Sequence, residues 1–112
     1  MIVLYGPSAM WDKFSQAEQS QILEKYYAWV AKLKGENRFK SGSELSRSAR
    51  ELKNVGGCIV VDGPFAETKE ALTGYFMIEA ESIDEAAEIA KGCPALGHGE
   101  TVQVYEIPKR GG

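Results

Sequence analysis

Two helix-start signals, one in each half of the chain, constrain its fold more than any other feature. Ser15-Gln16-Ala17-Glu18 and Ser82-Ile83-Asp84-Glu85 are both capping boxes, in which the serine oxygen and the glutamate carboxylate satisfy free amide donors of a new helix. Apolar residues then recur at helical spacing, which predicts one helix over about residues 16–34 and a second that ends at Gly92-Cys93-Pro94. The strands must therefore be arranged around two helices.

Apolar runs bounded by turn residues predict four strands: residues 1–5, 58–62, 72–80 and 101–107. The 58–62 strand is continuously apolar from Cys58 to Val61, so we expect both of its faces to be buried. Residues 36–56 are expected to form a polar, partly extended arm. This order predicts an α+β fold, a ferredoxin-like sandwich with an antiparallel sheet and both helices on one face. Three aromatic residues are expected in the core rather than as a stacking platform: Trp11, Tyr27 and Trp29.

Apolar side chains alternate onto both faces of the predicted strands, with Ile2 and Leu4 on one face and Val3 and Tyr5 on the other. Two helices cover one face, and the other would exceed the roughly few hundred Å² of contiguous apolar surface that monomers tolerate. We therefore expect a homodimer whose sheets stack face to face and enclose a small-molecule cleft. The alternative is that the arm over residues 36–56 folds back over its own sheet.

The composition of the 112 residues argues against several classes of function. A formal charge of −3 provides no basic surface for a phosphate backbone, so no direct nucleic-acid binding is expected. No apolar run approaches the ~20 residues that span a bilayer, and we expect a cytoplasmic protein without membrane association. Cys58 and Cys93 are expected as free thiols. A single histidine and scattered carboxylates predict no metal site, and no cofactor motif is present.

Asp62 and His98 form the sharpest catalytic hypothesis. A sheet ordered as last strand, first strand, 72–80 and 58–62 brings both residues to one rim. An imidazole titrates near pH about 6.5, which suits general acid or base catalysis. The two strands concerned stand three spacings apart, roughly 14 Å, so a direct contact requires the His98 loop or a partner subunit to reach across. The alternatives are an aspartate that holds the Gly63-Pro64 turn and a solvent-exposed loop histidine.

Four further residues at the same rim are candidates for binding a substrate. Lys69 could bind an anionic or carbonyl group and Glu67 could act as a base if buried, and both are equally explained as exposed loop charges. Tyr75 is most simply a core residue whose hydroxyl reaches the cleft. Tyr5 ends the first strand beside it.

The run from Val61 to Glu70, Val-Asp-Gly-Pro-Phe-Ala-Glu-Thr-Lys-Glu, resembles the signature of the YCII-related family in its DGPF-domain branch. The resemblance continues through Gly74-Tyr75, Cys93-Pro94 and the closing Val102-Gln103-Val104 strand, and it covers nearly the whole chain. It implies one domain over residues 1–112 that forms a dimeric α/β barrel with a pocket between sheets.

The same resemblance implies two kinds of function. Some members of the wider family carry a His and Asp pair and a relative is a dehydrochlorinase of an aromatic ring, whereas DGPF-type domains also occur beside sigma factors. In this chain Asp62 transfers by motif, while the first helix has no histidine and Tyr105-Glu106 stands where relatives have Arg-Pro. The first hypothesis is a cofactor-independent enzyme for proton transfer, elimination or isomerisation on a small metabolite. The second is a non-catalytic small-molecule-sensing or interaction domain linked to transcription.

Overall fold

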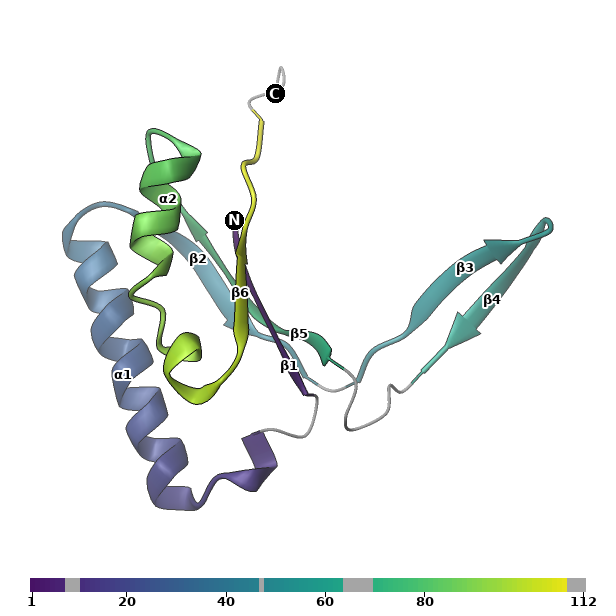
Figure 1. The fold of residues 1–112 in the computed structure, drawn as a ribbon, viewed down its shortest axis with the longest axis horizontal. Coiled ribbons are helices and arrows are strands. Elements are labelled where there is room, and N and C mark those ends of the chain that lie inside the picture. The colour runs from purple at the N-terminus through teal and green to yellow at the C-terminus, as the bar shows by residue number, and fades with distance from the viewer. Residues whose placement is uncertain (8–10, 47, 64–69, 109–112) are drawn as a thin grey trace.

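The computed structural model describes residues 1–7, 11–46, 48–63 and 70–108 (Figure 1). Both predicted helices are confirmed, with α1 one residue longer than expected at its end. The helices and strands follow one another in this order: β1 (Ile2–Pro7), η1 (Trp11–Lys13), α1 (Gln16–Gly35), β2 (Phe39–Glu44), β3 (Glu51–Val55), β4 (Cys58–Asp62), β5 (Glu70–Ile78), α2 (Ile83–Ala90), η2 (Pro94–His98) and β6 (Thr101–Val104).

Four strands form one antiparallel sheet in the order β2-β5-β1-β6. β1 is central, because its Ile2 pairs with Phe76 of β5 on one side and with Val104 of β6 on the other. With β3 and β4 set aside, the chain runs strand, helix, strand, strand, helix, strand. That chain order and this sheet order are consistent with a ferredoxin-like α+β fold. The predicted α+β class with an antiparallel sheet is confirmed.

The fourth strand of the sheet is not the one that the sequence predicts. β2 pairs with β5, although it lies in the segment expected to be a polar arm, and residues 58–62 pair with β3 instead. The Gly56-Gly57 turn, with φ of 59° and 89°, gives β4 a partner two residues away and favours that hairpin. The expectation that 58–62 is buried on both faces is also wrong, because every residue of β4 is exposed.

The core lies between the sheet and the two helices, which cover the same face (Figure 1). Ile2 and Leu4 of β1 pack there against Trp29 and Leu33 of α1, and all four side chains are at least nine-tenths buried. The expected core position of Trp29 is therefore confirmed. Trp11 and Tyr27 are instead 38% and 69% exposed, so the prediction is wrong for them.

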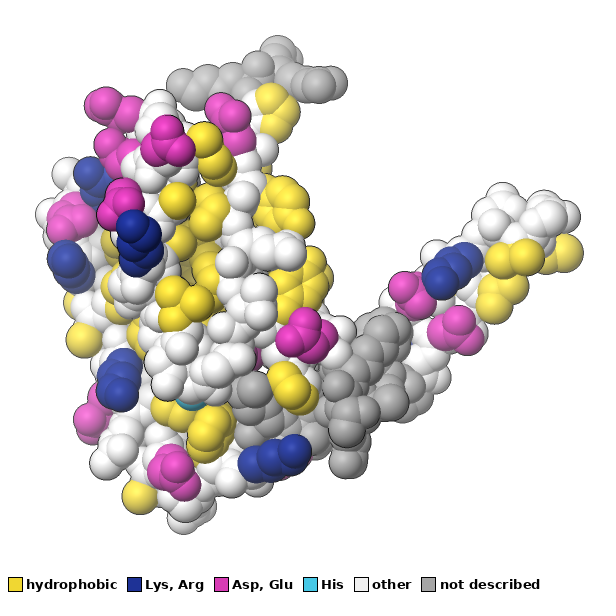
Figure 2. Space-filling model, in the orientation of Figure 1, with side chains coloured by type: hydrophobic (Ala, Val, Ile, Leu, Met, Phe, Trp, Pro, Cys, Tyr) yellow, Lys and Arg dark blue, Asp and Glu magenta, His cyan; other side chains and the backbone are white. Residues whose placement is uncertain are grey.

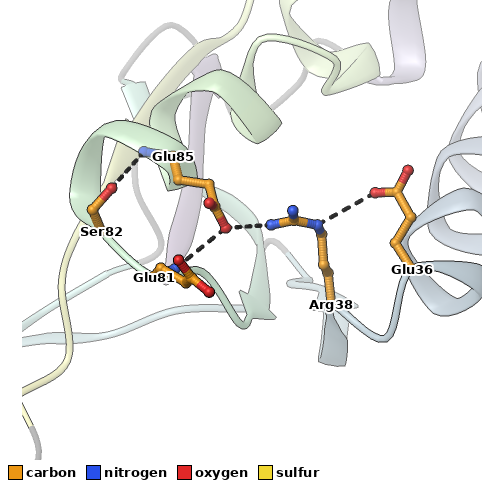
Figure 3. A network of polar contacts seen from close by, with 5 residues as sticks. All are labelled: Glu36, Arg38, Glu81, Ser82 and Glu85. Atoms are coloured by element: carbon orange, nitrogen blue, oxygen red, sulfur yellow. Dashed lines mark hydrogen bonds and ion pairs between the residues drawn. The ribbon is translucent and has the colours of Figure 1, made fainter.

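The two predicted capping boxes differ in the structure. At α1 the box is complete, since Ser15 Oγ accepts from the Glu18 amide and Glu18 Oε1 accepts from the Ser15 amide, both at 3.1 Å. At α2 the Ser82 hydroxyl accepts from the Glu85 amide at 3.0 Å, but the Glu85 carboxylate accepts from the Glu81 amide at 3.3 Å rather than from Ser82 (Figure 3). In the second capping box, the bond from the Ser82 amide to the Glu85 carboxylate is thus replaced by one from the Glu81 amide.

Arg38 binds the same carboxylate oxygen of Glu85 that accepts from the Glu81 amide (Figure 3). Its Nη1 donates to Glu85 Oε1 at 2.5 Å, and its Nε lies 3.4 Å from Glu36 Oε1. The hydrogen bond from Arg38 is the main reason that the pKa of Glu85 lies below its usual range, and the same bond raises the pKa of Arg38. This network ties the connection between α1 and β2 to the start of α2.

Among the described residues no helix lies on the other face of the sheet, and the β3–β4 hairpin projects on that side (Figure 1). We call this face the open face. The strand registers place Val3, Tyr75, Met77 and Gln103 on it, opposite to the core residues. Figure 2 shows hydrophobic side chains gathered beside β6 on this side. The arm does not fold back over the sheet, because β2 joins its edge and β3 leaves it.

Candidate functional site

The structure separates Asp62 from the rim where the sequence placed it. Asp62 ends β4, pairs with Glu51 across the hairpin and is exposed. The predicted shared rim with His98 is wrong for one chain, since it required β4 to be the fourth strand of the sheet. Glu67 and Lys69 lie outside the described residues, and their roles stay predictions.

The two candidate tyrosines lie in the four-stranded sheet. Tyr5 pairs with Leu72 of β5 and with Thr101 of β6, and Tyr75 pairs with Val3 of β1. Both side chains are partly buried. Tyr75 lies on the open face, away from the helices, so it belongs to the side on which the sequence predicts the cleft. Their contact with a substrate stays a prediction.

His98 is paired with an acid that the sequence patterns did not single out. Its Nε2 lies 3.1 Å from Oε2 of Glu100, and the two side chains are 13% and 8% exposed. The alternative of a solvent-exposed loop histidine is therefore wrong. When Glu100 is ionised its carboxylate can accept but not donate a hydrogen bond, so in that state the contact assigns the ring proton of His98 to Nε2. In the neutral ring, Nδ1 is then the nitrogen that can take up a proton.

The local backbone explains why two residues so close in sequence can face each other. His98 ends the short helix η2, and Gly99 follows with φ of 91°, a left-handed conformation that costs glycine little. The amides of Gly99 and Glu100 both donate to the Ala95 carbonyl, which closes the turn. On the facing strand β1, a Cβ at Gly6 would lie 2.9 Å from Cγ of Glu100. Glycine at position 6 therefore makes room for the carboxylate.

Aromatic rings surround the imidazole of His98. Phe14, just before α1, meets it edge to face with ring centroids 5.8 Å apart, and Tyr26 of α1 does so at 6.3 Å. Tyr26 also stacks on Phe76 of β5 at 6.0 Å, and Trp29 meets the edge of that ring at 5.0 Å. Each such pair adds roughly 0.5–1.5 kcal/mol beyond the area that it buries. The cluster fixes the imidazole between helix and sheet.

Two further protons are held tightly beside the pair. Burial raises the pKa of the Tyr26 hydroxyl far above its usual range, and the negative charges of Cys93 and Glu100 add to the shift. Burial also raises the pKa of the Cys93 thiol to about 11, opposed by a hydrogen bond to the Ala95 backbone and assisted by Glu100. Tyr26 is therefore a neutral hydrogen-bond donor at physiological pH, and Cys93 is a protonated thiol.

A groove runs between α1 and the β2–β5 half of the sheet and continues to the base of the β3–β4 hairpin at Arg50 and Glu51, and His98 and Glu100 lie in its wall. The groove is open to solvent. Its volume is about 1590 Å³, which exceeds the roughly 300–1,000 Å³ of a typical small-molecule pocket. Gly42 and Gly74 leave its floor without side chains. Lys34 stands at its side with Nζ 5.3 Å from the ring centre of Phe39. His98 is therefore among the residues that a small molecule in the groove would contact.

The groove combines an apolar wall with a few polar groups that can act on a bound molecule. A neutral His98 can accept a proton at Nδ1, Glu100 stabilises the imidazolium that results, and Tyr26 can donate to a developing negative charge. Within the described ranges, no three His, Cys, Asp or Glu side chains converge as metal ligands would. None of the described helices combines the length and apolar character that crossing a bilayer requires.

Sequence reasoning found His98 and missed Glu100. The signal was available, since His98-Gly99-Glu100 places an acid two residues from the histidine across a glycine that can turn the chain. Tyr26 lies on the face of α1 that packs against the sheet, where its ring stacks on Phe76. Its place beside His98 depends on how the helix crosses the sheet.

Comparisons with known proteins give a family and no reaction. A family model described as the YCII-related domain matches residues 3–108. An uncharacterised protein of Rhizobium meliloti (strain 1021) is 30% identical over 93 residues, which cover 80% of this chain and 75% of that protein. The match spans both helices, the whole sheet and the His98–Glu100 pair.

Proposed function

The chain belongs to the YCII-related family, and we propose that it is a cofactor-independent enzyme that moves a proton on a small molecule bound in the groove. The observation that carries the proposal is the His98–Glu100 pair, which is part-buried and hydrogen-bonded at 3.1 Å. An acid that orients a histidine is the arrangement by which proteins make a general base. Elimination and isomerisation both begin with such a proton transfer.

Each group has a distinct role in this proposal. Nδ1 of His98 removes a proton from carbon next to a carbonyl or an aromatic ring, and Glu100 holds the ring and stabilises its positive charge. Tyr26 donates a hydrogen bond to the oxygen on which negative charge develops. The aromatic wall of Phe14 and Phe76 favours a planar, largely apolar substrate.

We further propose that the protein is a homodimer of the DGPF branch and resides in the cytoplasm. The run from Val61 to Glu70 supports the branch, and the free thiols of Cys58 and Cys93 are typical of a reducing compartment. Tyr75 and Met77 are half-buried on the open face and leave apolar surface there, which supports association through the sheet.

Deuterium exchange into small carbon acids tests the proposed chemistry without knowledge of the natural substrate. A panel of ketones, keto acids and hydroxy-aromatic compounds is incubated with the protein in D₂O, and loss of each C–H signal is followed by proton NMR. We expect exchange in at least one compound, with the rate lowered about 10²–10⁴-fold in His98→Gln and less in Glu100→Gln.

The matched control is Glu88→Gln, which also removes one carboxylate but lies on the exposed side of α2 beside Lys91. It should leave the exchange rate unchanged. Exchange that survives in His98→Gln would contradict the assignment of the base. Compounds that bind and shift the signals of groove residues without any exchange would favour the sensing function instead.

A further inference from the structure

The β3–β4 hairpin, residues Glu51–Asp62, is an isolated pair of strands. Each strand pairs with the other and with no further strand of the described chain. Two-stranded hairpins are at best marginally stable in water without a third element to cover them. The hairpin therefore needs a partner to keep this form.

The two faces of the hairpin differ in character. Residues opposite each other in an antiparallel pair project to the same side, so Leu52, Ile59 and Val61 share one face with Asn54. The three apolar side chains are 62%, 62% and 57% exposed. We call this side the apolar face of the hairpin. The opposite side mixes apolar residues with charges: Glu51, Lys53, Val55, Cys58, Val60 and Asp62.

The chain is more extended, and exposes more surface, than a compact monomer of its length. Its radius of gyration is 16.1 Å, against about 13 Å for a compact chain of this length. It exposes 7877 Å², whereas a monomeric protein of 12.3 kDa exposes about 6,100 Å². The excess is about 1,800 Å² per chain, or about 3,600 Å² for two chains. That area lies inside the roughly 2,000–5,000 Å² buried by obligate homodimers.

The placement of the hairpin favours a second copy of this chain as the partner. The hairpin projects on the side of the open face (Figure 1), so a copy that covers the open face comes within its reach. Stacked sheets lie about 10 Å apart, and five strand residues extend about 17 Å. Each strand of the hairpin is thus longer than the spacing between stacked sheets, so the hairpin of one chain can reach the edge of a second chain's sheet stacked on the first.

We infer that the apolar face of the hairpin docks on the second subunit at the margin of its open face, and that each subunit gives and receives one hairpin. This inference rests on the proposed homodimer and names the segment that holds it together. Asp62 and the start of the Val61–Glu70 run then lie at the subunit interface, which gives that run a role in assembly. The His98–Glu100 contact involves no residue of the hairpin and does not depend on this inference.

The test compares two double variants by sedimentation equilibrium over a wide range of protein concentration. Leu52→Gln with Ile59→Gln changes the apolar face, and Glu51→Gln with Lys53→Gln changes the opposite face of the same strands. We expect a dimer for the natural chain and for the second variant. The first variant should dimerise at least about a hundredfold more weakly, because four apolar side chains, two in each subunit, lose their burial.

Hydrogen–deuterium exchange supplies a second readout. Amides of residues 51–62 should be protected in the dimer and lose that protection in the apolar-face variant, while the amides of β1 stay protected. If the first variant fails to fold by circular dichroism, a chain in which a short glycine-serine linker replaces residues 51–62 takes its place. It should be folded and monomeric.

Three outcomes would overturn the inference: a natural chain that stays monomeric, an apolar-face variant that dimerises as tightly as the natural chain, or a dimer whose hairpin amides exchange freely. The first outcome also removes the proposed homodimer, whereas the other two leave a dimer that forms through the sheet alone. The proton-transfer proposal stands or falls separately, in the exchange assay on His98→Gln.

Discussion

Adding one methyl group at Gly6 should displace Glu100 and so weaken its hydrogen bond to His98. In Gly6→Ala the new Cβ would lie 2.9 Å from Cγ of Glu100, whereas ordinary contacts begin at 3.4 Å. Glu100 must therefore retreat by about 0.5 Å. If that shift reaches Oε2, the 3.1 Å contact to His98 lengthens to about 3.6 Å, which is no longer a hydrogen bond.

The expected cost is about 1–3 kcal/mol of unfolding free energy, from overpacking and from the weakened hydrogen bond together. This lowers Tm by roughly 4–12 °C for a domain of this size. Gly35→Ala is the matched control, because a Cβ there meets nothing within 4 Å and the position ends a helix. It should be neutral or slightly stabilising.

A double-mutant cycle measured by urea unfolding decides whether the cost passes through Glu100. In a Glu100→Ala background the side chain that collides with the new methyl group is gone, so Gly6→Ala should cost much less there than in the natural chain. An equal cost in both backgrounds, or a cost no larger than that of Gly35→Ala, would refute this account of Gly6.

Three further perturbations test other parts of the structure. At mildly alkaline pH a thiol reagent should modify exposed Cys58 quickly and buried Cys93 only as the protein unfolds. Because burial raises the pKa of Cys93 to about 11, this thiol should make the unfolding free energy fall as pH rises from about 9 toward 11. Urea unfolding of Cys93→Ala over the same pH range should lack that fall. Arg38→Gln should destabilise the fold at neutral pH and progressively less in acid. The lowered pKa of Glu85 means that its ionised form stabilises the fold, and this contribution is lost as the pH falls through the folded-state pKa of Glu85. Equal destabilisation at pH about 3 and 7 would contradict this. Gly42→Ala should cost about 1–3 kcal/mol in urea unfolding, because its Cβ would lie 2.6 Å from Cδ1 of Phe76, and a neutral result would mean that the floor of the groove adapts.

The helices and three of the four sheet strands were predictable because their signals are local. Ser15 and Ser82 each cap a helix through an amide three residues ahead, and the apolar spacing that follows needs no distant partner. The central strand β1 is almost entirely apolar, which marks it as buried.

The edge strand β2 could not be predicted in the same way. Its sequence, Phe39–Glu44, contains one large apolar side chain, and backbone pairing with β5 stabilises it rather than burial. For β4 the apolar side chains suggested a strand buried in the sheet. Instead, a short glycine turn pairs β4 with β3 and leaves it exposed. The apolar pattern of a strand shows that it has side chains to bury, but it does not show what covers them.

The candidate site was predictable in part for a similar reason. His98 could be chosen from composition because the chain has one histidine. Its partner could not, because Glu100 meets it through the turn at Gly99 and the space left by Gly6, and both depend on the folded backbone. Asp62 was placed at the rim through a sheet order that held for three strands and failed for the fourth.

The most direct test of the central claim is nitrogen NMR of the single histidine ring in ¹⁵N-labelled protein. If Glu100 orients His98 as a base, the neutral ring should carry its proton on Nε2 in the natural chain, and Glu100→Gln should weaken that preference. A ring that carries its proton on Nδ1, or whose two nitrogens are unaffected by Glu100→Gln, would contradict the role that we assign to the pair.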